Sequence, residues 1–280
     1  MRTVFFYALA GLRWQLIGWG LAMFALAVLL VARYDLMVGS KEKFKALLDS
    51  PLGEVVQFFG DKETMFTAEG FLDLQLFSFL PLVLGIFVIL NGSGMLALDE
   101  ERGTLDLILA HPASRSALFV GRLLAFGAAT IVIVALSWLG VVVASTRSTL
   151  EVNALDLALP YLSFLAALLV FGTLALLLSM VLPSRRTAAM TAGLVLVASF
   201  FFTMLARNDP GMVTAARLLP LYYFQAGKAM RGLDLGPFAG LLAVAGVFAG
   251  LAWWRFERRD IRVSGEGSWK FSLFRRKAAS

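Results

Sequence analysis

Six stretches of the sequence are long, apolar and free of Asp, Glu, Lys, Arg and His, and no other feature constrains the fold as much. Each is close to the roughly 20 residues that an α-helix needs to cross the hydrocarbon of a bilayer. Their length and continuity favour membrane helices over buried strands. We therefore predict an all-α polytopic membrane protein with six transmembrane helices. The expected spans are residues 14–32, 74–98, 123–144, 161–182, 188–206 and 236–254.

The composition agrees with a chain whose solvent is partly lipid. Of the 280 residues, 59% are hydrophobic and only 16% are charged, against about a quarter charged in a soluble domain. So much apolar surface could not be buried in one water-soluble core, and a disordered chain is far less apolar. Because the chain has no Cys and one His, a disulfide scaffold and a Cys/His zinc or iron–sulfur site are excluded.

The distribution of Lys and Arg predicts which side each connection faces, because cytoplasmic connections are enriched in these residues. With a cytoplasmic N-terminus, 15 of the 25 Lys and Arg lie inside, and the inner and outer charges sum to +8 and −2. We therefore expect both termini inside, with one six-span domain over residues 1–262 and a basic cytoplasmic tail over residues 263–280. Residues 1–13 are expected to form an amphipathic helix on the inner surface.

Other segments carry local predictions. The long outer loop, residues 35–73, suits one or two helices at the outer interface. In the second span, Pro81 is expected to kink the helix near its outer end, and residues 91–94 (Asn-Gly-Ser-Gly) to weaken it near its inner end. The aromatic residues 222–224 before the sixth span are typical interface anchors. Small-residue pairs in the sixth span are interpreted as intramolecular helix packing, and these glycines are Gly236, Gly240, Gly246 and Gly250.

The absence of ionisable residues from every predicted span limits the chemistry of this chain. Proton relays and buried catalysis need such residues inside the bundle, whereas sodium coupling through carbonyls and hydroxyls remains open. The phosphate-binding pattern G-x-x-x-x-G-K-[ST] occurs nowhere in the sequence. We expect no catalytic site, metal or cofactor in this chain, so if ATP drives the protein, a separate chain must bind it. His111, beside Pro112, is interpreted as a surface or interface histidine.

The connection between the second and third spans, residues 99–122, is too long for a tight turn. Thr104 can cap a short helix, which the leucines after it make partly apolar and which Pro112 should stop. Four of the seven acids on the predicted inner side cluster here. With no nucleophile–base pair, the segment suits docking of a partner rather than catalysis. The predicted docking residues are Asp99, Glu100, Glu101, Arg102, Gly103, Thr104, Leu105, Asp106, Leu107, Leu109, Pro112 and Arg115.

The tail interleaves aromatic and basic residues. Basic residues beside a membrane attract anionic lipid by roughly 1 kcal/mol each. Since the inner leaflet is adjacent, we expect the tail to contact lipid and expect no nucleic-acid partner. The lipid-facing residues predicted here are Lys270, Arg275, Arg276 and Lys277.

The connection also carries a family resemblance. Residues 101–105 (Glu-Arg-Gly-Thr-Leu), residues 112–115 (Pro-Ala-Ser-Arg) and Gly121-Arg122 resemble the E-x-G-T-L-x-x-L-L, P-x-S-R and G-K elements of permease subunits of ABC-2 type ATP-binding-cassette exporters. Arg122 replaces the usual Lys. The ending over residues 254–261 is similar to the family's F-x-x-R-D-[IL], and residues 221–224 resemble its aromatic pattern before the last span.

The resemblance implies several properties. Two permeases, identical copies or close paralogues, would pair and bind two cytoplasmic ATPase subunits, which hold the ATP and the magnesium. The helix over residues 101–109 would be the coupling helix, seated in an ATPase groove, and residues 1–13 would match the elbow helix. The protein would lie in the inner (plasma) membrane of a prokaryotic-type cell.

The leading hypothesis is therefore a permease subunit of an ATP-driven exporter. Its alternatives are a membrane scaffold or sensor that recruits a partner without moving a solute, and a sodium-type ion exporter of the same family. Hydroxyl and amide side chains are scattered among aliphatic residues in the spans, which favours an amphipathic or apolar substrate such as a drug, antibiotic, peptide or lipid-like molecule. These polar residues are Ser78, Asn91, Ser93, Thr130, Ser137, Ser163, Thr173, Ser179, Thr191, Ser199 and Thr203.

Overall fold

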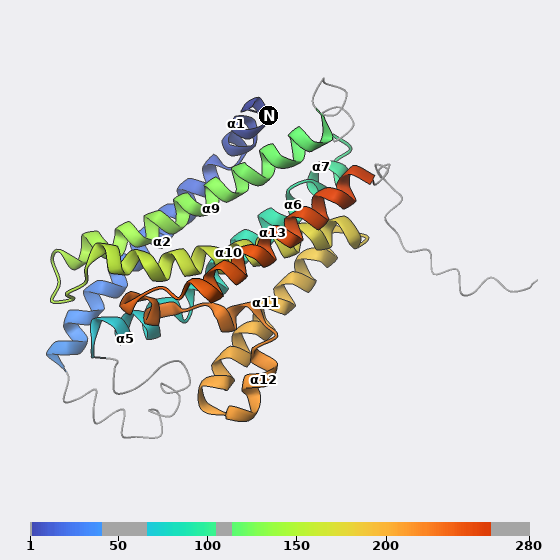
Figure 1. Ribbon diagram of the computed structural model, residues 1–280. Coiled ribbons are helices and arrows are strands. Elements are labelled where there is room, and N and C mark those ends of the chain that lie inside the picture. The colour runs from blue at the N-terminus through green and yellow to red at the C-terminus, as the bar shows by residue number, and fades with distance from the viewer. Residues whose placement is uncertain (1, 41–65, 105–113, 259–280) are drawn as a thin grey trace, which may run out of the picture.

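The regular structure of the protein is helical wherever the chain is described. The computed structural model describes residues 2–40, 66–104 and 114–258, and these ranges contain no strand (Figure 1). The α-helices are α1 (Arg2–Gly11), α2 (Arg13–Gly39), α5 (Ala68–Leu72), α6 (Leu80–Gly94), α7 (Ala97–Glu101), α9 (Arg115–Ser145), α10 (Ala154–Val181), α11 (Arg185–Asn208), α12 (Val213–Ala216) and α13 (Leu235–Arg258). The tighter or wider turns are the π-helical η1 (Asp73–Phe77) and the 3₁₀ helices η2 (Pro210–Met212), η3 (Pro220–Tyr223) and η4 (Ala226–Arg231).

Five of the described helices are long and apolar enough to cross a membrane, namely α2, α9, α10, α11 and α13. A sixth candidate is a helix pair, Ala68–Phe77 and Leu80–Gly94, bent by 41° at a short break. The all-helical class is thus confirmed for the described residues, and the predicted count of six is reached if this bent pair is one span. The other predicted helices, in the outer loop over residues 41–65, in the connection over residues 105–113 and in the tail, lie outside the described residues.

The helix of the first predicted span, α2, continues past its predicted end at residue 32. Helix α2 runs to Gly39, so the outer loop expected to begin at residue 35 begins as helix. Tyr34 is buried and donates a hydrogen bond of 3.1 Å to the Phe66 carbonyl oxygen. The Asp35 carboxylate accepts the Thr149 N–H at 2.8 Å and the Thr149 hydroxyl at 2.7 Å. Packing and these polar contacts hold the extra two turns in place, although they lie beyond the apolar stretch.

The break in the second span lies where Pro81 predicts it. Proline has no N–H, and its ring collides with the carbonyl of the residue four positions earlier, here Phe77. The chain leaves α-helical geometry through η1, where the Ser78 hydroxyl donates to the Asp73 carbonyl oxygen at 2.8 Å. Helix α6 then ends at Gly94, within the weakened segment over residues 91–94.

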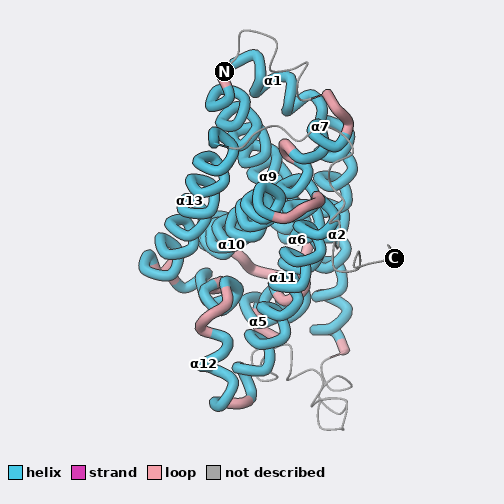
Figure 2. The backbone as a smooth tube through the Cα atoms, turned by 90° about the vertical axis from the view of Figure 1, so that its right-hand side faces the viewer, coloured by secondary structure: helices cyan, strands magenta, loops and turns pink. Residues whose placement is uncertain are grey.

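Helix α10 lies at the centre of the bundle. It packs against α6, α9, α11 and α13, as Figure 2 shows. It lies very close to α6, where a Cβ added at Gly92 would lie 3.0 Å from the carbonyl carbon of Gly172. The backbones of the two helices therefore touch at this pair of glycines. Helix α2 and the N-terminal helix α1 both pack on α9.

The segment between α11 and α13 folds back against the bundle rather than lying only at an interface. The Ser199 hydroxyl accepts the Leu221 N–H at 2.9 Å, and the Ser163 hydroxyl accepts the Gln225 N–H at 3.1 Å. Phe224 packs between Phe77 and Phe164, at ring distances of 6.3 and 5.7 Å. Phe224 thus also packs within the chain, and the interpretation of residues 222–224 as interface anchors stays a prediction.

The glycines of the last span do not pack inside the chain. A Cβ added at Gly240, Gly246 or Gly250 would meet no atom within 4 Å, and one at Gly236 would meet only Asp234. The expectation of intramolecular packing through these residues is wrong, because α13 turns a different side, with Leu241, Ala245 and Ala252, towards α10.

Candidate functional site

The described part of the predicted docking connection begins at α7 and lies at the end of the bundle where α1 also lies, which we call the α7 end (Figure 1). The opposite end, where α5 and α12 lie, is the α5 end. The α7 end includes Asp99, Glu100, Glu101, Arg102, Gly103, Thr104 and Arg115 of the predicted site. The predicted residues outside the described ranges are Leu105, Asp106, Leu107, Leu109 and Pro112 of the connection and Lys270, Arg275, Arg276 and Lys277 of the tail.

The Gly103-Thr104 pair forms a tight turn after α7. Gly103 has a φ of 67°, in the left-handed region where a side chain is strained. This conformation turns the chain back, so that the Thr104 N–H donates to the Asp99 carbonyl oxygen at 2.9 Å. The Thr104 hydroxyl lies 3.3 Å from the same oxygen and 3.4 Å from Asp99 Oδ1, and it shares its proton between them. The glycine and threonine of the motif therefore have a local structural reason.

Replacing Gly103 by alanine is expected to destabilise this turn. An L-residue with a Cβ in the left-handed region costs about 1 kcal/mol, so Gly103→Ala should lower the midpoint of thermal unfolding in detergent by a few degrees. Asparagine tolerates this conformation better than other residues, and Gly103→Asn is the matched control. Equal midpoints for Gly103→Ala and the unmodified protein would show that the turn is not held in this conformation.

The Asp99 side chain is bound to α9. Arg122 of α9 forms an ion pair with Asp99 Oδ2, and its Nη1 donates to the Met95 carbonyl oxygen at 2.5 Å. The Arg122 and Asp99 side chains are 12% and 21% exposed. Met95 is the C-cap residue directly after α6, where the carbonyl groups of a helix lose their partners within the helix. One guanidinium thus satisfies the broken helix end and holds α7 against α9.

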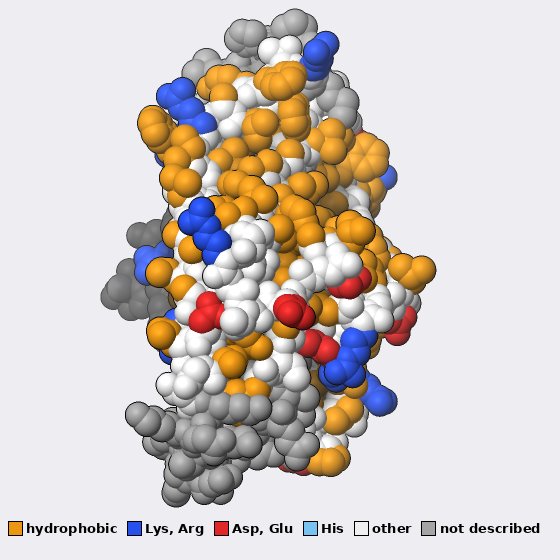
Figure 3. Space-filling model, turned by 90° about the vertical axis from the view of Figure 1, so that its left-hand side faces the viewer, with side chains coloured by type: hydrophobic (Ala, Val, Ile, Leu, Met, Phe, Trp, Pro, Cys, Tyr) orange, Lys and Arg blue, Asp and Glu red, His pale blue; other side chains and the backbone are white. Residues whose placement is uncertain are grey.

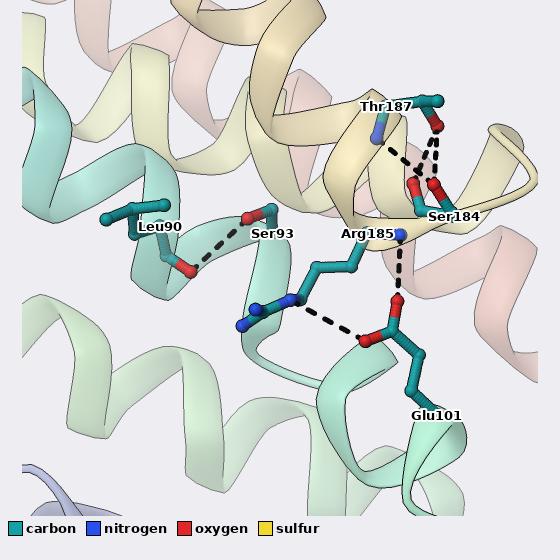
Figure 4. Close-up of polar contacts among 6 residues, drawn as sticks. All are labelled: Leu90, Ser93, Glu101, Ser184, Arg185 and Thr187. Atoms are coloured by element: carbon teal, nitrogen blue, oxygen red, sulfur yellow. Dashed lines mark hydrogen bonds and ion pairs between the residues drawn. The ribbon is translucent and has the colours of Figure 1, made fainter.

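Glu101 is bound to the start of α11. Its Oε1 accepts the Arg185 N–H at 3.2 Å, and its Oε2 lies 3.7 Å from Arg185 Nε (Figure 4). Ser184 caps the same helix end, because its hydroxyl accepts the Thr187 N–H at 3.1 Å. A carboxylate beside the N-terminus of a helix is stabilised by the helix dipole. The Arg185 side chain also crosses Gly94, where an added Cβ would lie 3.2 Å from Nη1.

The docking connection ends at the start of α9, where a serine caps this helix. The Ser114 hydroxyl accepts the Ala117 N–H at 3.1 Å, so this serine of the Pro-Ala-Ser-Arg element is an N-cap. Two residues later, the Ser116 hydroxyl donates to the Glu257 carboxylate near the end of α13. Both ends of the connection, at α7 and at the start of α9, are therefore held in place by contacts within the chain.

The acids of this region differ in their surroundings. Asp99 and Glu101 are paired with arginines of the same chain, Glu100 is half-buried, and Arg102 is exposed. The acidic cluster is therefore partly a structural node and not simply a charged surface for a partner. Within the described ranges, no group of three His, Asp or Glu side chains is placed to hold a metal ion.

Sequence reasoning did not single out Arg185 as a site residue, although one indication was present. Arg185 and Arg186 follow Ser184 directly, at the start of a helix. Positive charge is unfavourable at a helix N-terminus unless an acid compensates it. A nearby carboxylate is therefore favourable at this helix start, but only the folded chain brings Glu101, 84 positions away, to Arg185.

A second polar cluster lies at the α5 end. Asp73 of η1 lies 3.4 Å from Arg207 Nη1 of α11, and its Oδ1 accepts the Gly227 N–H at 3.1 Å. Glu69 of α5 pairs with Arg231 of η4 at 2.7 Å. Figure 3 shows a broad hydrophobic band on one face, with acidic side chains gathered below it. The charges of the described helices thus lie towards their ends, as a membrane protein requires.

A comparison with protein families agrees with these features. A family model described as ABC-2 family transporter protein matches residues 3–261, which is nearly the whole chain. No curated protein matches the chain at a significant level.

Proposed function

Because the chain belongs to the ABC-2 family of transporter proteins, we propose that it is the membrane-spanning permease of an ATP-driven exporter and that a separate ATPase chain docks at its α7 end. The observation that carries this proposal is a pair of ion pairs in α7. Asp99 and Glu101 hold the start of the docking connection against α9 and α11. A docking segment held in this way passes force from a partner into helices that cross the membrane. The absence of a phosphate-binding motif from the sequence fits an ATPase on another chain.

The α7 end is proposed to face the cytoplasm. The bias of Lys and Arg supports this orientation, since 15 of the 25 belong to this side under the predicted topology. In this arrangement α1 is the elbow helix on the inner surface. The tail over residues 263–280 then contacts the inner leaflet of the plasma membrane of a prokaryotic-type cell.

The proposed assembly has two permease copies, identical or paralogous, and two ATPase subunits that hold ATP and magnesium. The pairing follows from the family resemblance, and exposed aliphatic and aromatic side chains on α6 and α11 leave a surface that either lipid or a second copy would cover. These side chains are Ile86 and Leu90 on α6 and Met190, Leu194, Val197 and Phe201 on α11.

The substrate is proposed to be apolar or amphipathic. Most hydroxyls of the spans are engaged within the chain, as in the Thr130 bond to the Phe126 carbonyl oxygen at 2.9 Å and the contact of 3.1 Å between Ser137 and Tyr161. Eight of these Ser and Thr residues are buried, so within the described helices they do not supply a polar lining for an ion. The surfaces left for a path are largely apolar, which favours a drug, antibiotic, peptide or lipid-like molecule over sodium.

The test is ATP-dependent transport by the reconstituted complex. The chain is co-expressed with a candidate ATPase, purified and placed in vesicles, and uptake of a panel of amphipathic compounds and of sodium is measured with and without ATP. We expect the ATPase to co-purify and an amphipathic compound to raise hydrolysis and accumulate with ATP. An ATPase whose phosphate-binding lysine is replaced is the control. Co-purification without any transport would favour a scaffold or sensor, and sodium movement alone would favour an ion exporter.

A further inference from the structure

The second span and α11 are joined by ion pairs at both of their ends. The two elements run in opposite directions, so the end of one meets the start of the other. At the α7 end Glu101 pairs with Arg185, and at the α5 end Asp73 pairs with Arg207, with shortest side-chain distances of 3.7 and 3.4 Å. Both arginines belong to α11; Asp73 is in η1 of the second span, and Glu101 is in α7, just after that span. The pairs therefore bind one helix to the other near its first and last turns.

Between these pairs, α6 and α11 pack closely. A Cβ added at Gly85 of α6 would lie within 3.4 Å of Leu196 Cγ on α11. The glycine thus lets the two helices approach, and Leu196 fills the space that a side chain would take. A close apolar contact with an ion pair at each end fixes the register of the two helices, because sliding would break both pairs together.

The chain connectivity makes the pair at the α7 end important. Residues 105–113 join α7 to α9, so a displacement of the docking connection reaches α9 through the covalent chain. Helix α11 begins about 80 positions later and has no such covalent link to α7. Two polar contacts of Glu101 join α7 to α11. Its carboxylate accepts the Arg185 N–H at 3.2 Å and forms an ion pair with the Arg185 side chain.

At its other end α11 leads into the folded-back segment Pro210–Arg231. Ser199 of α11 accepts the Leu221 N–H at 2.9 Å, which ties this segment to the helix. The same segment is tied to the second span by the Gly227 bond to Asp73 and by the Arg231 pair with Glu69. A movement of α11 along its axis would therefore displace the segment as well.

We propose that Glu101 and Arg185 are positioning residues that transmit displacement of the docking connection to α11, and that α11 carries it to the segment Pro210–Arg231 at the opposite end of the bundle. This inference rests on the proposed function, because it names the contact through which a docked ATPase acts on the far side. The Arg185 and Glu101 side chains are 36% and 46% exposed. An exposed pair adds little to stability, so its removal is expected to leave the fold intact.

The experiment uses the absence of cysteine from the sequence. Leu218, which is 84% exposed between α12 and η3, is replaced by cysteine as a reporter. Complexes are purified through a tag on the ATPase, so that only assembled complexes are compared, and reaction with a membrane-impermeant maleimide is timed with ADP and with a trapped ATP state. We expect the labelling rate of Leu218→Cys to differ between the two states.

The variants then test the proposed contact. In the Leu218→Cys background, Arg185→Gln and Glu101→Gln are each expected to abolish the nucleotide-dependent difference. The charge swap Glu101→Arg with Arg185→Glu should restore it, because the pair is re-formed with reversed signs. Glu151→Gln, an exposed glutamate at the α5 end, is the matched control and should keep the difference.

The possible outcomes distinguish a failure of the proposed function from a failure of the inference about Glu101 and Arg185. No difference between nucleotide states in the Leu218→Cys protein would overturn both the proposed function and this inference. A difference that persists in Arg185→Gln, or one that the charge swap does not restore, would overturn the inference alone. Failure of Arg185→Gln to assemble with the ATPase would also overturn it, since Arg185 would then act in docking and not in transmission.

Discussion

Replacing Gly92 by alanine is expected to destabilise the protein more than any other single methyl group added to its helices. The new Cβ would lie 3.0 Å from the carbonyl carbon and 3.2 Å from the Cα of Gly172, and closer still to the carbonyl oxygen. These are backbone atoms in the middle of α10, so no side chain can rotate away. Helices α6 and α10 would have to separate, at a cost of about 1–3 kcal/mol for an overpacked interior.

The measurement is thermal unfolding in detergent, with Gly250→Ala as the matched control. Gly250 lies in α13, and an added Cβ there would meet nothing within 4 Å. Since alanine is favoured over glycine in a helix by roughly 0.5–1 kcal/mol, Gly250→Ala should leave the midpoint unchanged or raise it slightly. Gly92→Ala should lower it by roughly 5 °C. Equal midpoints for the two variants would show that the α6 and α10 backbones do not touch at this position.

Replacing Arg122 by methionine is expected to release α7 from α9. Methionine keeps much of the length of the side chain but leaves the Asp99 carboxylate and the Met95 carbonyl oxygen without the guanidinium. Since the Arg122 and Asp99 side chains are only 12% and 21% exposed, the unpaired groups cost about 1–3 kcal/mol. We expect a lower unfolding midpoint and a loss of ATPase co-purification, because the start of the docking connection is no longer fixed.

Two further variants isolate the ion pair from general damage. Arg122→Lys keeps the charge but cannot bind both oxygens in the same way, so an intermediate result is expected. The double variant Asp99→Asn with Arg122→Met should cost less than the sum of the single changes, because neighbouring residues that share an interaction are not additive. Strictly additive losses would mean that Asp99 and Arg122 do not stabilise each other.

These two predictions concern different features of the second span. Gly92 determines how closely α6 lies to α10, and Arg122 determines where α6 ends and α7 is held. Both features lie at the α7 end, within the segment that leads to the docking connection. The packing of the bundle and the placement of the proposed docking segment therefore depend on the same few turns of helix.

Much of the fold could be predicted from the sequence. The charge-free stretches predicted the long helices, and five of them are long enough and apolar enough to cross a membrane. The break in the second span follows from Pro81, which affects only its own helix. By contrast, the end of α2 at Gly39 depends on contacts with Phe66 and Thr149. A local pattern cannot contain such contacts, since their partners lie far away in the chain.

Part of the candidate site could likewise be predicted from the sequence, and part could not. The Gly103-Thr104 turn and the Ser114 cap are local, and the motif that contains them could be found by inspection of the sequence. The partners of Asp99 and Glu101 could not, because Arg122 and Arg185 reach them only after the helices have packed. For the same reason the sequence could not show that most hydroxyls of the spans are bonded within the chain.

The sequence by itself determined the class of this protein, because hydropathy and charge act on each segment separately through the solvent that surrounds it. It also determined the family: short motifs of contiguous residues indicated it, and the family model that matches residues 3–261 confirms it. Only the tertiary structure decided which acids are engaged within the chain, which glycines bring helices together and which face open space. These properties depend on distances between residues remote in sequence, and such distances are set by packing of the whole bundle.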